Sequence, residues 1–107
     1  MSARAEVDLI NRNNKSYRFW IYRDGYPDGV VSNLPDDEME FEDVRRKLYL
    51  GDDYDSMPDF YYVISLADRT IEVYDADYSE TDWQRGELIF QGTFAEAKQK
   101  FLSEDKM

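Results

Sequence analysis

The chain has 107 residues, of which 24 are acidic and 13 basic, and its formal net charge is −11. It contains neither cysteine nor histidine, which excludes disulfides, thiol nucleophiles, Cys/His zinc sites and histidine-based catalytic triads. No apolar run approaches the roughly 18 residues of a membrane span, and the N-terminus lacks the pattern of a signal peptide. We therefore expect a single acidic domain over residues 1–107, located in the cytoplasm.

The beginning of the chain predicts two strands joined by a tight turn. Residues 3–10 alternate between apolar and charged side chains, which is the pattern of a half-buried strand. The aromatic run 17–22 predicts a second strand, and the asparagine-rich segment 11–14 predicts the turn of a hairpin because asparagine tolerates positive φ. The proline at the second position and the glycine at the fourth position of segment 26–29 predict a type I turn. The two valines at 30–31 would then continue as an edge strand.

A helix over about 38–50 is predicted next. Acidic residues stand at its expected start, where they complement the helix dipole, and basic residues stand toward its end. Phe41, Val44 and Leu48 recur on one face and would form its apolar stripe. Gly51 is the expected end of this helix.

Three strands and a second helix are predicted in the rest of the chain. Runs 60–66 and 70–76 predict strands joined by a short hairpin connection, and 87–91 predicts a last strand. Thr93 followed by Glu96 is a capping box, which predicts the start of a C-terminal helix. The whole pattern predicts an α+β fold in the order ββαβββα: an antiparallel sheet of about five strands with two helices packed on one face.

The negative charge is concentrated between residues 36 and 87. Binding of phosphate backbones or anionic lipid needs a surplus of Lys and Arg, so we expect no direct nucleic-acid binding and no membrane binding. Two interpretations remain open. The acidic residues form either a solvated face that keeps a small protein soluble, or an acidic docking surface.

The spacing of the carboxylates along the sequence favours neither catalysis nor metal binding. A carboxylate hydrolase would need two acids at a defined separation in a concave site, and close pairs arise by chance in a chain this acidic. The acidic runs that begin at Asp53 and Asp75 alternate as calcium ligands do, but neither has the glycine at position six or the glutamate at position twelve of an EF-hand. We therefore predict no catalytic residue, no metal site and no cofactor.

The first third of the chain resembles a group of small phage and bacterial proteins. The resemblance lies in Met1-Ser2-Ala3-Arg4-Ala5 and in Tyr22 followed by the run Asp24-Gly25-Tyr26-Pro27-Asp28-Gly29. Many members of the group have a histidine and another residue between the tyrosine and the Asp-Gly pair, whereas only Arg23 stands there in this chain. The resemblance implies a phage or prophage origin and a role in binding host machinery, and it implies no catalytic residues.

The leading hypothesis is a non-enzymatic protein that docks on a basic surface of a host protein, for instance as a nucleic-acid mimic that inhibits host defence or nucleic-acid machinery. Carboxylates on a rigid surface can occupy Lys and Arg groups that otherwise hold phosphates. The candidate docking carboxylates are Asp36, Asp37, Glu38, Glu40, Glu42, Asp43, Asp52, Asp53 and Asp55. Four aromatic residues in loops or at element ends are candidate anchors: Tyr49, Tyr54, Tyr78 and Trp83.

An alternative hypothesis is a small-ligand protein that binds or sequesters a nucleotide-like signal at the loop of residues 24–29. The candidate ligand-binding residues are Arg18, Arg23, Asp24, Gly25 and Tyr26. Guanidinium groups suit phosphate oxygens, but the loop lacks the Lys-Ser/Thr of a P-loop. The sequence decides neither the partner's identity nor the oligomeric state.

Overall fold

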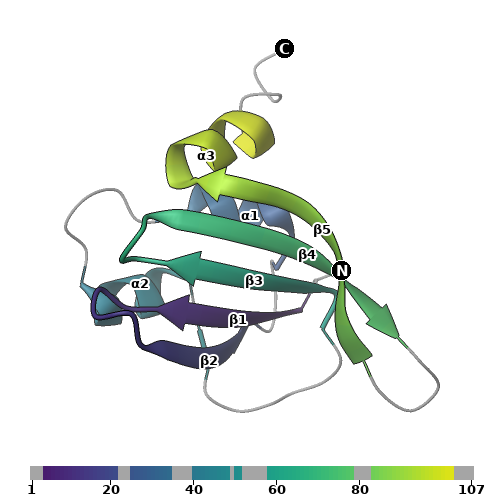
Figure 1. Ribbon diagram of the computed structural model, residues 1–107, viewed down its shortest axis with the longest axis horizontal. Helices are drawn as coiled ribbons and strands as arrows, with labels where there is room; N and C mark the ends of the chain where they lie inside the picture. Colours follow the sequence, from purple (N-terminus) through teal and green to yellow (C-terminus); the bar gives the residue numbers. More distant parts are fainter. Residues whose placement is uncertain are drawn as a thin grey trace.

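The computed structural model describes residues 4–21, 25–34, 40–48, 50–51, 58–78 and 83–102. These residues form one α+β domain in which helices pack on a five-stranded sheet (Figure 1). In chain order the elements are β1 (Ala5–Ile10), β2 (Ser16–Ile21), α1 (Pro27–Ser32), α2 (Phe41–Lys47), β3 (Phe60–Ser65), β4 (Thr70–Tyr78), β5 (Trp83–Thr93) and α3 (Phe94–Leu102). The strand order in the sheet is β2-β1-β3-β4-β5.

The predicted hairpin between the first two strands is confirmed. β1 and β2 pair antiparallel, with Ala5 opposite Ile21 and Ile10 opposite Ser16. The Asn11 side-chain Oδ1 accepts hydrogen bonds from the backbone N–H groups of Asn13 (2.9 Å) and Lys15 (3.0 Å). Asn14 has φ of 65°, a conformation that asparagine adopts more easily than most residues. The turn is therefore fixed by its own side chains.

The sheet is mixed, which corrects the prediction of an antiparallel sheet. β3 pairs parallel to β1, whereas the β1–β2, β3–β4 and β4–β5 pairs are antiparallel. The prediction assumed that each strand lies beside the next in sequence. The chain instead passes from β2 through α1 and α2 before β3 begins beside β1, and parallel neighbours need such a crossover connection.

The first helix, α1, stands where the sequence predicted a type I turn and an edge strand. Pro27 lies in the first turn of α1, where a missing N–H costs nothing, and the Tyr26 carbonyl accepts the Val30 N–H at 3.0 Å. Val30 and Val31 are buried against the sheet. Their packing therefore outweighs the β propensity of two consecutive valines, and the described residues contain three helices in place of the two predicted.

The second helix, α2, is shorter than predicted. Its buried residue Val44 and its C-cap residue Leu48 form the expected apolar face. Gly51 does not cap the helix; it forms an antiparallel bridge with Trp20, with hydrogen bonds of 3.0 and 2.8 Å. This bridge fixes the segment that follows α2 to the outer edge of β2.

The last two strands are longer than predicted, and β5 contains two irregularities in its pairing with β4. Register shifts lie between Val73 and Tyr74 and between Tyr74 and Ala76, and such bulges increase the local twist of a strand. The predicted capping box is confirmed. The Thr93 N–H donates to Glu96 Oε1 at 2.8 Å, and the Glu96 N–H donates to Thr93 Oγ1 at 3.1 Å.

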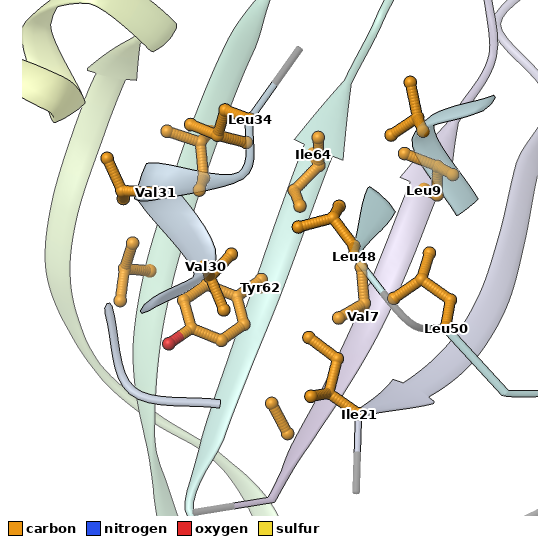
Figure 2. Packing of buried hydrophobic residues seen from close by; sticks show 14 of the residues in the cluster. Val7, Leu9, Ile21, Val30, Val31, Leu34, Leu48, Leu50, Tyr62 and Ile64 are labelled. Carbon is orange, nitrogen blue, oxygen red and sulfur yellow. The ribbon is translucent and has the colours of Figure 1, made fainter. Parts of the chain in front are cut away.

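The hydrophobic core lies on one face of the sheet, so the prediction that the helices pack on one face is confirmed. Figure 2 shows Val30 of α1 beside Tyr62 of β3, and Leu48 and Leu50 beside Val7 of β1. Phe94 and Ala97 of α3 belong to the same cluster. No helix among the described residues is long and apolar enough to cross a membrane.

Candidate functional site

Three of the predicted docking carboxylates lie at the beginning of α2. Glu40 is the N-cap residue, Glu42 and Asp43 lie in the first turn, and all three are exposed. The helix is held firmly beneath them. Val44 is buried, and the Phe41 ring contacts the rings of Tyr17 and Phe19 at centroid distances of 5.3 and 6.0 Å. The structure thus places these carboxylates together on a fixed element.

Two of these carboxylates have ion-pair partners on the same helix. Arg45 lies 3.6 Å from Glu42, and Arg46 lies 3.6 Å from Asp43. Both carboxylate side chains are at least half exposed, and exposed pairs of this kind contribute about 0–1 kcal/mol. The pairs are therefore weak enough for a partner's cation to exchange with them.

Most other predicted docking residues lie outside the described residues. These are Asp36, Asp37, Glu38, Tyr49, Asp52, Asp53, Tyr54 and Asp55. In sequence they belong to the segments directly before and after α2. The backbones of Tyr78 and Trp83 pair at the end of the β4–β5 hairpin.

The structure does not bring the alternative ligand-binding residues together. Arg18 pairs with Asp8 on the face of the sheet opposite the core. Gly25 and Tyr26 lie on the core side, where the Gly25 carbonyl accepts the Tyr62 hydroxyl and the Tyr26 ring contacts Phe60. The sheet thus separates Arg18 from Gly25 and Tyr26. Arg23 and Asp24 lie outside the described residues.

A polar network that the sequence analysis did not single out lies on the uncovered face of the sheet, by which we mean the face opposite the core. Arg18 Nε lies 3.1 Å from Glu6 Oε2 and 3.0 Å from Asp8 Oδ1. The Asp8 carboxylate also accepts a hydrogen bond from the Tyr61 hydroxyl. Glu6 and Asp8 stand two residues apart on β1, so both side chains point to this face.

The network continues across the sheet through aromatic rings. The Arg85 guanidinium lies 4.4 Å from the Tyr61 ring centroid and 4.6 Å from that of Tyr74, and it donates to the Tyr61 hydroxyl at 3.0 Å. The Tyr74 hydroxyl donates to Glu72 at 2.6 Å. Side chains from all five strands thus form one connected set.

Glu6 and Tyr61 are two of the members of this network whose pKa values are raised. Desolvation raises the pKa of the Glu6 carboxyl above its ordinary value, and the opposing effect of the Arg18 charge is smaller. Burial, followed by the hydrogen bond to Asp8, raises the pKa of the Tyr61 hydroxyl to about 12. At neutral pH Tyr61 is therefore a hydrogen-bond donor to Asp8.

The sequence contains a partial signal for this network. The alternation of β1 placed Glu6 and Asp8 on one side of the strand, but the continuous apolar run of β3 gave no indication of which face Tyr61 would occupy. Tyr74 and Arg85 come together with Tyr61 only through the pairing of three strands. A single sequence does not show which strands pair or which residues lie opposite one another.

A hollow of about 370 Å³ lies at the distal part of the β4–β5 hairpin, lined by Asp75, Ala76, Asp77, Arg85, Gly86 and Glu87. Asp75 Oδ1 accepts the Glu87 N–H at 2.7 Å. No group of three or more acidic side chains in the described part of the chain is arranged to hold a metal ion. Comparison of the chain with protein-family models, curated proteins and solved structures gives no match.

Proposed function

We propose that the protein is a non-enzymatic docking protein whose acidic residues around α2 bind a basic surface of a partner protein. The observation that carries the proposal is the exposure of Glu40, Glu42 and Asp43 on one turn of a firmly packed helix. The sequence adds further carboxylates in the segments that adjoin α2 on both sides. Nine of the 24 acidic residues of the chain therefore lie between positions 36 and 55.

The physical basis of docking is charge complementarity. Opposite charges accelerate encounter and select the partner more than they add to final affinity. A partner's Lys or Arg can replace the weak pairs that Glu42 and Asp43 make with Arg45 and Arg46, since these contacts are long and exposed. A partner that normally holds nucleic acid presents such cations, so the acidic surface would compete with phosphates for the same site.

The test compares a variant of α2 with a charge-matched control. The α2 variant is Glu40→Gln, Glu42→Gln, Asp43→Asn. The control carries the same loss of three charges at exposed positions outside α2, namely Asp68→Asn, Asp77→Asn and Glu87→Gln. Each protein is immobilised, partners are captured from cell lysate and identified, and the capture is repeated over a salt series and with duplex DNA as competitor.

We expect the α2 variant to lose capture and the control to retain it. Capture by the unaltered protein should weaken as salt rises, because screening acts strongly on exposed charges, and duplex DNA should displace the partner. Capture that is insensitive to salt, or equal in the two variants, would contradict the proposal.

A further inference from the structure

The uncovered face of the sheet carries several apolar side chains that are exposed or only half-buried among the described residues. Tyr74, Val63 and Trp20 are half-buried there, and Leu88 and Ile89 of β5 are 44% and 40% exposed. The buried residues of all three helices belong to the core on the opposite face. In the described part of the chain, no helix therefore covers this apolar surface.

The exposure of Leu88 and Ile89 follows from the irregular pairing of β5. Val73 lies opposite Phe90 and Tyr74 lies opposite Leu88, so Ile89 is an extra residue in the strand. A bulge of this kind redirects side chains. Phe90 points to the core side, where its ring contacts Phe101, and the two consecutive aliphatic residues Leu88, which lies opposite Tyr74, and Ile89 remain exposed. Contiguous exposed apolar groups mark interaction surfaces.

The outermost charges of this face are positive, in contrast to the chain as a whole. The Arg18 side chain is 56% exposed, whereas the Glu6 and Asp8 side chains that it contacts are only 6% and 17% exposed. Arg85 is exposed as well and is held in place by the rings of Tyr61 and Tyr74. The Glu6 and Asp8 carboxylates thus lie beneath the Arg18 guanidinium, and Glu72, which is half-buried on the same face, accepts the Tyr74 hydroxyl. Each guanidinium has five N–H donors, more than the contacts described above use.

From this arrangement we infer that the uncovered face is a second docking surface, and that it binds an apolar segment of a partner protein flanked by carboxylates. Leu88, Ile89 and Tyr74 contact the apolar side chains of that segment, and Arg18 and Arg85 bind its acidic groups. Tyrosine, tryptophan and arginine are the residue types that contribute most to binding at protein interfaces. This surface is independent of the acidic residues around α2.

Charge complementarity favours an apolar segment with acidic flanks over two other partners of this face, a basic segment and a second copy of the chain. A basic segment would place its cations against Arg18 and Arg85. A second copy of the chain packed face to face with Arg18 or Arg85 opposite its own counterpart would bring like charges together, which costs several kcal/mol. An apolar segment with acidic flanks places carboxylates, and no cations, against Arg18 and Arg85. At physiological ionic strength the Debye length of about 8 Å screens the acidic remainder of the molecule from such a segment.

The test uses the isotope-labelled full chain and three peptides of equal length, in which leucine alternates with glutamate, serine with glutamate, and leucine with lysine. We expect the leucine–glutamate peptide to shift the amide resonances of Tyr74, Arg85, Leu88 and Ile89. It should bind about tenfold more tightly than the serine–glutamate peptide, because only leucine buries apolar surface against β5. The double variant Leu88→Ser, Ile89→Ser should abolish that preference. Tyr26→Ser removes a ring of similar exposure on the core side and should leave the preference for the leucine–glutamate peptide intact.

Three results would overturn the inference: tighter binding of the leucine–lysine peptide at these resonances, no shift of these resonances with any peptide, or a dimer detected by light scattering that Leu88→Ser, Ile89→Ser dissociates. None of them bears on capture through α2, because that assay uses different residues. Loss of capture in the α2 variant, with the peptide preference intact, would likewise leave this inference standing.

Discussion

The Tyr62 hydroxyl, at the middle of β3, donates a hydrogen bond of 2.5 Å to the backbone carbonyl of Gly25, immediately before α1 begins. Both residues are buried. Burial, followed by the charge of Asp28, raises the pKa of the Tyr62 hydroxyl, so it remains a donor at neutral pH. The bond fixes the start of α1 to the centre of the sheet.

Replacement of Tyr62 by phenylalanine should therefore destabilise the protein by about 1–3 kcal/mol, because the buried Gly25 carbonyl would lose its donor. The effect should be largest near α1. Denaturation by urea would measure the loss, and hydrogen exchange would show reduced protection of the Val30 amide, which bonds to the Tyr26 carbonyl. Tyr17→Phe, at an exposed ring, is the control and should change neither quantity. Equal protection of Val30 in the Tyr62 variant would contradict this role.

The raised pKa of Glu6 predicts a pH-dependent contribution to stability. The folded state binds the Glu6 proton more tightly than the unfolded chain, whose carboxyl titrates near the ordinary value of 4.5. The stabilising contribution is therefore complete below pH 4.5 and is lost as the pH rises through the folded pKa. The difference in free energy of unfolding between the unaltered protein and Glu6→Gln should fall over this interval. Denaturation at a series of pH values measures it.

The direction in which this difference in the free energy of unfolding changes with pH distinguishes two physical effects on the Glu6 carboxyl. If desolvation dominates, the difference falls with rising pH, as stated. If the ion pair with Arg18 dominated, the folded state would favour the carboxylate and the difference would rise instead. Asp68→Asn, at an exposed position, should show no comparable trend and serves as the control.

Local signals in the sequence predicted most elements of this fold, and their failures have a common cause. The capping box of Thr93 and Glu96 and the turn of residues 11–14 depend on neighbours in sequence, and both are confirmed. α1 was not predicted, because the burial of Val30 and Val31 against the sheet decides between helix and strand there. The parallel pairing of β3 with β1 likewise depends on contacts between distant segments.

The two candidate sites differ in the same way: one follows from the sequence itself, and the other depends on contacts between distant segments. The acidic residues around α2 are a property of composition, so the sequence alone identified them as candidates. The uncovered face depends on strand register. Tyr61, Tyr74 and Arg85 are brought together by the pairing of β3, β4 and β5, and the exposure of Leu88 and Ile89 depends on a bulge whose position no local motif reveals.

The capping box offers a prediction for the C-terminal helix. Thr93→Ala should destabilise the protein by about 1 kcal/mol, because the Glu96 N–H would lose its acceptor at the start of α3. Thr93→Ser keeps the hydroxyl and should cost much less. Thermal or urea denaturation of the two variants measures the difference, and equal losses would show that the Thr93 hydroxyl does not cap α3.

The close approach of Gly86 to Asp75 predicts a coupled pair of substitutions in the hairpin hollow. A Cβ atom at position 86 would lie 2.1 Å from Asp75 Oδ1 and 3.1 Å from the Asp75 carbonyl oxygen. Gly86→Ala should therefore cost about 1–3 kcal/mol through overpacking. Asp75→Ala should cost about 1 kcal/mol, because the Glu87 N–H loses its acceptor.

The double variant Asp75→Ala, Gly86→Ala should be less destabilised than the sum of the two single variants, because removal of the Asp75 carboxylate removes the main collision. Residues in contact commonly show such interaction energies of about 0.5–3 kcal/mol. Urea denaturation of the four proteins of the cycle measures the coupling. Additive losses would mean that the alanine at position 86 is accommodated by a movement of the strand, and that the Asp75 side chain does not set the requirement for glycine.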